Sequence, residues 1–121
     1  MEKTILVIED DVDIQNYYEI ILSDLNLDCD ILRAYNGKEA LEIIDSGKHV
    51  NLIILDIVMP IIDGEKFLHE LQVIRKNNIP VIISTVDEVF ASGISKKAKF
   101  VGVFNKLDKI EKLTELIKKN L

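Results

Sequence analysis

Acidic residues follow two of the most apolar segments of this chain. The run 5–8 (Ile-Leu-Val-Ile) ends on the acids 9–11 (Glu-Asp-Asp), and the run 52–55 (Leu-Ile-Ile-Leu) ends on Asp56. Unbroken apolar runs of this kind are typical of parallel strands that are covered on both faces, and the carboxyl ends of such strands share one edge of the sheet. We therefore expect these acids to meet there. Like charges held close together are unfavourable unless a cation or a shared proton offsets them.

A magnesium ion is the simplest partner for such a cluster. A few carboxylate oxygens with space left for water suit Mg²⁺ better than Zn²⁺, and Ca²⁺ needs more oxygen ligands than these acids offer. Acids that follow strands also cap helices, and Asp11 or Asp13 could do only that. Capping alone leaves Glu9, Asp10 and Asp56 unexplained together. The sequence therefore predicts a Mg²⁺ site formed by these three residues.

Two further apolar segments end on residues that could bind a phosphoryl group. Segment 81–84 leads into Thr85, and segment 101–104 leads into Asn105 and Lys106. Each residue alone is a weak signal, because a threonine often ends a strand and a lysine is usually solvated. Acids, a hydroxyl and an ammonium at one edge are the groups that phosphoryl transfer to a carboxylate requires: the carboxylate attacks, and the cations and the hydroxyl bind the phosphoryl oxygens.

Strand and helix patterns that would position these residues alternate along the whole chain, without a linker, repeat or low-complexity tract. Strands are predicted over 4–8, 30–34, 51–56, 81–84 and 101–104. Helices are predicted over 12–25, 36–44, 63–76 and 108–119, with Tyr17 and Tyr18 on the apolar stripe of the first and with capping sequences at Asn36 and Asp108. Segment 87–99 has only a weak helical pattern and is expected to be short or mobile.

This alternation predicts an α/β fold, a flavodoxin-like doubly wound (βα)5 three-layer sandwich. Its parallel five-stranded sheet would have the strand order 2-1-3-4-5, because crossovers between parallel strands are right-handed. The first and third strands are then neighbours, which brings Asp10 and Asp56 together at the point where the strand order reverses. Ligands bind at that point in open sheets of this type.

Bulk properties restrict the class of protein. A chain of 121 residues, 48% hydrophobic and 30% charged, predicts one soluble domain over residues 1–121. No apolar run is long enough to span a membrane, and no signal peptide precedes the first strand, so we expect a cytoplasmic protein. Cys29 is the only cysteine, so an internal disulfide is excluded. The net charge of -6 argues against direct binding of nucleic acid.

Taken together, the motifs resemble the receiver domain of bacterial two-component response regulators, and the resemblance covers the whole chain. It rests on Ile-Glu-Asp-Asp at 8–11, Asp-Ile-Val-Met-Pro at 56–60 with Asp-Gly at 63–64, the strand from Pro80 to Thr85, and the segment from Gly102 to Lys106.

The resemblance implies that Asp56 accepts a phosphoryl group from a histidine kinase or a histidine phosphotransfer protein. Asp10 and Asp56 would bind Mg²⁺ directly, Glu9 would act through water, and the backbone carbonyl of Val58 would be a further ligand. Lys106 would pair with the phosphoryl group, and Thr85 would be the switch hydroxyl that moves toward it. The only chemistry implied is the domain's own phosphorylation and dephosphorylation, so it would not be an enzyme; it would regulate an effector protein or domain.

Ile20 is a candidate partner contact. At ~100° per residue it lies off the apolar stripe of its helix, and receivers use that face for kinase or phosphotransfer helices. Isolated exposed apolar residues are also common, so the contact stays open against that simpler interpretation.

The chain departs from the family pattern in three places. Leu107 follows the lysine where the family has a proline with a cis bond, Val86 follows the hydroxyl where a small residue is usual, and Val103 replaces an aromatic, with Phe104 facing the other way. A cis bond before a residue other than proline costs about 2.5 to 4 kcal/mol, so we predict a trans peptide between Lys106 and Leu107.

Two alternatives belong to other classes. A pseudo-receiver would bind partners without phosphorylation, but the acid, hydroxyl and lysine positions are all filled. A phosphatase with an aspartyl nucleophile, of the haloacid dehalogenase type, resembles Asp-x-Asp after the first strand, whereas Asp56 ends the third.

Overall fold

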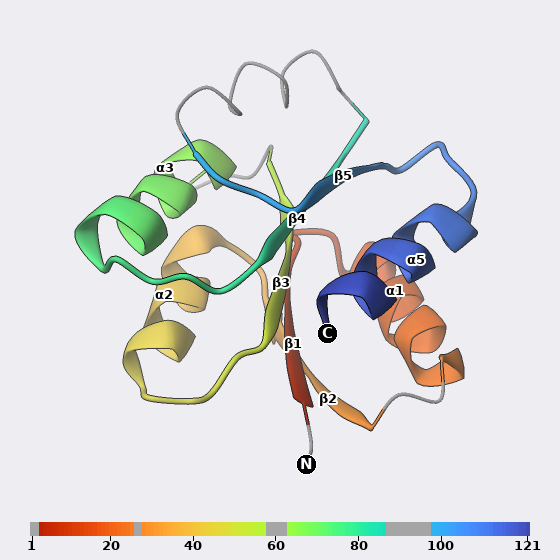
Figure 1. Cartoon of the computed structure of the whole chain (residues 1–121), viewed down its shortest axis with the longest axis horizontal. Coiled ribbons are helices and arrows are strands. Elements are labelled where there is room, and N and C mark those ends of the chain that lie inside the picture. The colour runs from red at the N-terminus through yellow and green to blue at the C-terminus, as the bar shows by residue number, and fades with distance from the viewer. Residues whose placement is uncertain (1–2, 26–27, 58–62, 87–97) are drawn as a thin grey trace.

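The structure is a computed structural model that describes residues 3–25, 28–57, 63–86 and 98–121. Its strands form one parallel sheet in the order β2-β1-β3-β4-β5, as predicted (Figure 1). The strands are β1 (Lys3–Ile8), β2 (Cys29–Ala34), β3 (Leu52–Asp56), β4 (Val81–Thr85) and β5 (Gly102–Asn105). The helices are α1 (Val12–Asp24), α2 (Gly37–Asp45), α3 (Gly64–His69) and α5 (Ile110–Asn120), and the π-helical segment Glu70–Ile74 prolongs α3. The predicted doubly wound fold is confirmed. Most of the segment 87–99, where the weak helical pattern occurs, lies outside the described residues, which resume at residue 98.

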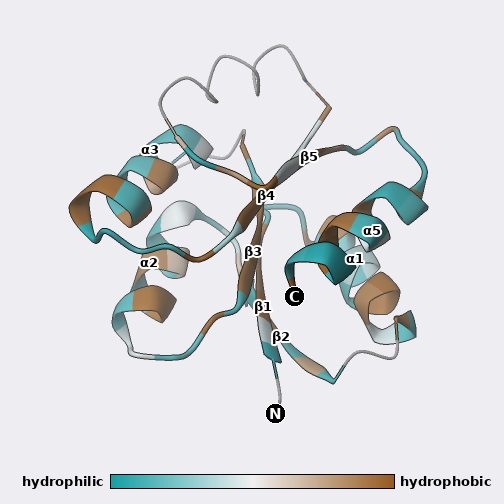
Figure 2. Ribbon diagram, viewed as in Figure 1, coloured by the Kyte–Doolittle hydropathy of each residue, from teal (hydrophilic) through white to brown (hydrophobic). Residues whose placement is uncertain are grey.

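The sheet separates two apolar cores, each covered by two of the described helices. Helices α2 and α3 lie on one face and α1 and α5 on the other (Figure 1). Strand β3 is buried along its whole length, and hydrophobic residues concentrate on the central strands of the sheet (Figure 2). Phe67 and Leu68 of α3 lie in the first core, and Leu22 of α1 and Leu113 of α5 lie in the second. Two covered faces explain why the central strands read as unbroken apolar runs.

Side-chain caps fix the starts of three described helices. Asp11 accepts hydrogen bonds from the backbone N–H groups of Asp13 and Ile14, and Asp63 accepts one from Lys66. Asn36 caps α2 by accepting from Glu39 N, as predicted.

The prediction of a cap at Asp108 was wrong. Helix α5 begins at Ile110 after Lys109, which makes no side-chain capping bond. Asp108 lies in the turn after β5, where its N–H donates to Asn105 O at 2.8 Å and its carboxylate pairs with Lys112. An acid before a helical pattern therefore signals a cap only where the turn brings it to the N-cap position.

The prediction that both tyrosines of α1 are core residues holds for Tyr18 only. Tyr18 is buried against the sheet with Gln15 and Leu22, whereas 54% of Tyr17 is exposed. Successive helical residues lie 100° apart, so two neighbours cannot both occupy the centre of the buried face. Ile20, predicted to lie off the stripe, is 62% exposed.

Candidate functional site

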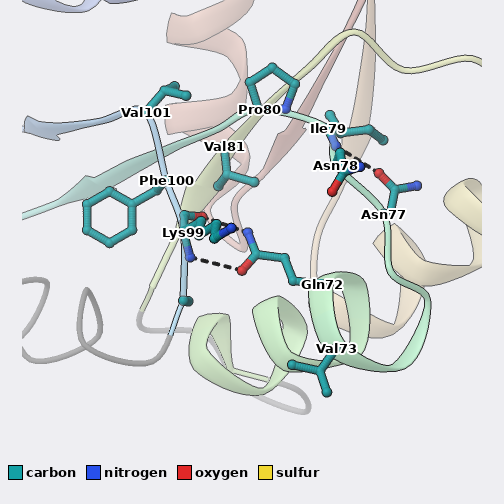
Figure 3. A pocket seen from close by; sticks show the side chains of 11 residues that line it. Gln72, Val73, Asn77, Asn78, Ile79, Pro80, Val81, Lys99, Phe100 and Val101 are labelled. Atoms are coloured by element: carbon teal, nitrogen blue, oxygen red, sulfur yellow. Dashed lines mark hydrogen bonds between the residues drawn. The ribbon is translucent and has the colours of Figure 1, made fainter.

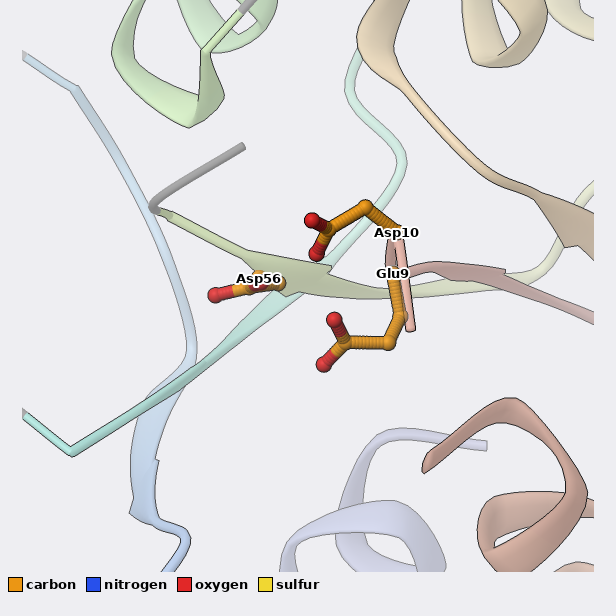
Figure 4. A group of neighbouring side chains, drawn as sticks. All are labelled: Glu9, Asp10 and Asp56. Carbon is orange, nitrogen blue, oxygen red and sulfur yellow. The ribbon is translucent and has the colours of Figure 1, made fainter. Parts of the chain in front are cut away.

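Three acids predicted to meet are brought together at the carboxyl edge of the sheet. Strands β1 and β3 pair in register, with Ile8 opposite Leu55, so the residues that follow lie side by side. One carboxylate oxygen from each of Glu9, Asp10 and Asp56 lies within 4.8 Å of the others. Figure 4 shows the three side chains directed into the same region from the ends of β1 and β3. Glu9 and Asp56 are buried and Asp10 is exposed, so the cluster opens to solvent at Asp10.

Lys106 supplies a cation to this cluster. Its Nζ atom lies 2.7 Å from Glu9 Oε1 and 3.6 Å from Asp56 Oδ1, so its shorter contact is with Glu9. The backbone N–H of Lys106 donates to Thr85 O at 2.9 Å. This bond holds the start of the loop that follows β5 against the end of β4.

The loop after Lys106 is built without a cis bond. No cis peptide occurs among the described residues, so the trans prediction for Lys106 and Leu107 is confirmed. Asn105 organises the turn: its Oδ1 accepts from Leu107 N at 2.9 Å and its carbonyl accepts from Asp108 N at 2.8 Å. Leu107 projects outward, 82% exposed.

Burial dominates the electrostatics of the site. Desolvation raises the pKa of Glu9 to about 7, although the hydrogen bond from Lys106 opposes the rise. Burial lowers the pKa of Lys106, but its contacts with Glu9 and Asp56 outweigh that effect and hold its pKa above the ordinary value. Lys106 is therefore charged near neutral pH, while Glu9 exchanges its proton there.

The structure places Thr85 at the same edge, at the end of β4, where its side chain is buried. In the paired strands, Ser84 lies opposite Asp56 and Thr85 lies opposite Asn105. Thr85 is thus one residue beyond the level of Asp56 in the sheet. Val58, predicted to offer its carbonyl to the metal, lies outside the described residues.

Gln15 is a residue of the site that sequence reasoning missed. Its Nε2 atom lies 3.0 Å from Val7 O, 3.1 Å from Glu9 O and 3.0 Å from Ala34 O, which ties the ends of β1 and β2 to α1. Glu9 and Asp10 directly follow the end of β1 that the Gln15 side chain holds in place. A glutamine in an amphipathic helix reads as a surface residue, so only the polar break in the buried stripe could have indicated it.

The donor set fits a magnesium ion. It consists only of carboxylate oxygens, two of them on buried residues, and a divalent cation would offset the charge that burial makes unfavourable. Asp10 and Asp56 are the residues that would hold the ion directly. Glu9 already accepts from Lys106 Nζ and, at 3.3 Å, from Asp11 N, which suits a contact through water.

A cavity of about 540 Å³ lies elsewhere, beside the starts of β4 and β5 (Figure 3). Gln72 forms two hydrogen bonds with the backbone of Lys99 on its wall, at 2.6 and 3.0 Å. Val81 and Val101, which line it, lie at the start of β4 and directly before β5, at the edge of the sheet opposite the acids, so this cavity is separate from the acidic site.

The family model of the response regulator receiver domain matches residues 5–119, and the chain belongs to this family, whose members act in two-component signalling. The chain is 36% identical, over 125 aligned positions, to the probable transcriptional regulator ycf29 of Porphyra purpurea, covering 98% of this chain and 56% of that protein. It is 36% identical over 84 residues to the probable transcriptional regulator ycf27 of Cyanophora paradoxa, covering 69% of this chain and 33% of that protein. The chain therefore spans only part of the curated relatives that it matches.

A solved structure agrees with the fold over nearly the whole chain. The response regulator TrrA of Thermotoga maritima, crystallised in complex with Mg²⁺ and BeF, superposes with a TM-score of 0.85 and 32% identity, covering 98% of this chain and 99% of that one. Within the described residues, none of the helices is both long and apolar enough to cross a membrane.

Proposed function

We propose that the chain is a phosphoacceptor in which Asp56 takes a phosphoryl group from a histidine kinase or a histidine phosphotransfer protein. The observation that carries the proposal is the position of Asp56 between two acids and the Lys106 ammonium, 3.6 Å away. The family membership supports it, because two-component signalling transfers phosphoryl groups to receiver domains.

The residues divide the chemistry between them. An oxygen of the Asp56 carboxylate forms the new bond to phosphorus, while the bond from phosphorus to the donor's imidazole nitrogen breaks and its electron pair stays on that nitrogen. Lys106 balances the negative charge that arrives beside Asp56, and to do so its ammonium shifts from Glu9 toward the phosphoryl oxygens. Its flexible stem permits this movement.

Asp10 and Asp56 would hold a Mg²⁺ ion directly, Glu9 would act through water, and the Val58 carbonyl would be a further ligand. The bound ion would supply positive charge that neutralises phosphoryl oxygens. The TrrA structure contains Mg²⁺ with BeF, which supports a magnesium cofactor in a domain that is similar throughout its length.

Phosphorylation changes the binding of a partner through Thr85, in this proposal. Its hydroxyl moves toward the phosphoryl group and displaces the chain just beyond β4, at Val86. Val86, next in the chain, is 62% exposed, so the movement reaches the surface directly. The exposed side chain of Ile20 on α1 forms part of a surface for the kinase or phosphotransfer protein. The chain acts as a regulator of an effector protein or domain and not as an enzyme on other substrates.

Intact mass spectrometry after incubation with acetyl phosphate tests the proposal. The wild-type chain gains one phosphoryl group with Mg²⁺ and none with a chelator, because the metal is required. Asp56→Asn removes the acceptor and stays folded by circular dichroism, yet gains nothing. Persistent addition in Asp56→Asn would move the acceptor to another residue, and no addition to the wild type would favour an interaction module without phosphorylation.

A further inference from the structure

A pair of buried hydroxyl groups lies beneath the acidic site. Tyr18 of α1 and Ser84 of β4 are hydrogen-bonded to each other, and both side chains are at most 2% exposed. Ser84 is opposite Asp56 in the paired strands, and side chains at paired positions of adjacent strands project to the same face of the sheet. The pair therefore lies on the face of the sheet to which the Asp56 side chain also projects.

The Tyr18 hydroxyl interacts electrostatically with the charged groups of the acidic site. Burial raises the pKa of Tyr18 to about 12, and the charges of Lys106, Glu9 and Asp56 all act on it. The phenol is thus protonated throughout the physiological range and keeps its capacity to donate a hydrogen bond.

The hydrogen bond acts on the residue next to Thr85. Packing alone does not require it, because a phenylalanine and an alanine could fill the same space in this apolar core. Its effect is to tie the end of β4 to α1 through the side chain of Ser84. The backbone carbonyl of the next residue, Thr85, accepts a hydrogen bond from the backbone N–H of Lys106, which directly follows the adjacent strand β5. The backbone that carries the Thr85 hydroxyl is therefore held from two sides.

We propose that Tyr18 and Ser84 form a positioning pair that fixes the end of β4 so that Thr85 meets the phosphoryl group on Asp56. This inference rests on the proposed phosphoacceptor function and adds two residues to it. Neither residue touches the phosphoryl group: both act through the backbone of Thr85.

Beryllofluoride, a stable mimic of the phosphoryl group, separates positioning from simple stabilisation. Tyr18→Phe removes one oxygen and keeps the ring. With Mg²⁺ at saturation, NMR titration should show that this variant binds beryllofluoride about three- to tenfold more weakly than the wild type, the range that one neutral hydrogen bond supplies. Its Mg²⁺ affinity should stay within about twofold of wild type, because the three acids are untouched.

Tyr17→Phe is the matched control, since it removes the same atom from the exposed neighbouring residue and should change neither affinity. Ser84→Ala should reproduce the loss of Tyr18→Phe, and the double variant should be no weaker than either single one, because either change already breaks the bond. In a Thr85→Ala background, Tyr18→Phe should have no further effect. Ser84→Ala carries the test if Tyr18→Phe does not fold.

Several results would overturn the pair's role. Unchanged or tighter beryllofluoride binding in Tyr18→Phe would do so, as would an equal loss of Mg²⁺ affinity, which indicates general damage to the site. Additive losses in the double variant would show that the two hydroxyls act separately. A wild-type chain that binds no beryllofluoride would overturn the phosphoacceptor function and this inference together, whereas the other outcomes leave that function intact.

Discussion

Magnesium binding to this domain should depend on pH through Glu9. Burial raises the pKa of this carboxyl to about 7 from an ordinary value of 4.5. Protons and Mg²⁺ should therefore compete for the acidic cluster near neutral pH. With that pKa, Glu9 is ionised in roughly a tenth of the molecules at pH 6 and in roughly nine tenths at pH 8. A metal that needs the ionised form would bind about tenfold more tightly at the higher pH. Since we propose that Glu9 acts through water, we expect between about three- and tenfold.

The same shift fixes how the stability of the metal-free domain varies with pH. The native state binds the Glu9 proton more tightly than the unfolded chain does, so this contribution is fully present below pH 4.5 and is lost as the pH rises through about 7. The free energy of unfolding should fall across this window by an amount on the order of 3 kcal/mol. Saturating Mg²⁺ should reduce the fall, because the ion favours the ionised carboxyl.

Backbone NMR titrations with Mg²⁺ at several pH values measure the first effect, since the chain has no tryptophan for fluorescence. Urea unfolding measures the second. Glu9→Gln is the decisive variant, because it keeps the shape of the side chain and cannot titrate. A wild-type Mg²⁺ affinity that is flat from pH 6 to pH 8, or a pH dependence that persists in Glu9→Gln, would refute the assignment.

Three further outcomes follow from the geometry. Asp10→Asn should lower the Mg²⁺ affinity more than Glu9→Gln does in the same NMR titration at pH 8. Equal losses of affinity would contradict the different roles of the two acids. Lys106→Met should stay folded but take up phosphoryl groups from acetyl phosphate at least about tenfold more slowly by mass spectrometry, because Asp56 loses its cation; an unchanged rate would contradict this. Gly64→Ala should destabilise the domain by about 1–3 kcal/mol in urea, because the added Cβ would lie 2.6 Å from the Cα of Ile57; unchanged stability would show that the backbone at Ile57 and Gly64 separates at little cost.

Much of the fold and of the acidic site was predictable, because each depends on a sequence pattern that is compatible with one structure. Apolar runs that end on acids fix both the strand and the edge at which its acid lies. The strand order then brings Asp10 and Asp56 together before any side chain is placed. The start of α5 was less predictable, because an acid before a helical pattern does not show whether the turn brings it to the N-cap position, as Asp108 illustrates.

The remainder depends on contacts in three dimensions. Lys106 was expected near the acids, but its shorter contact with Glu9 than with Asp56 follows from side-chain paths that no sequence spacing encodes. Tyr17 and Tyr18 are alike in sequence, and only the packing of α1 on the sheet distinguishes them. The role of Gln15 was missed because its three carbonyl partners come from the ends of two different strands.

The interior position of β1 has a consequence for how the chain assembles. This strand is the first of the domain in chain order, yet it pairs on one side with β2 and on the other with β3, which begins at Leu52. The centre of the sheet can therefore not be completed until roughly half of the domain has been synthesised, and such long-range parallel pairing is intrinsically slow. Until β3 docks, Asp10 and Asp56 are apart and do not repel each other. The electrostatic repulsion between the acids therefore arises only when β3 pairs with β1, and divalent cations in solution should reduce it.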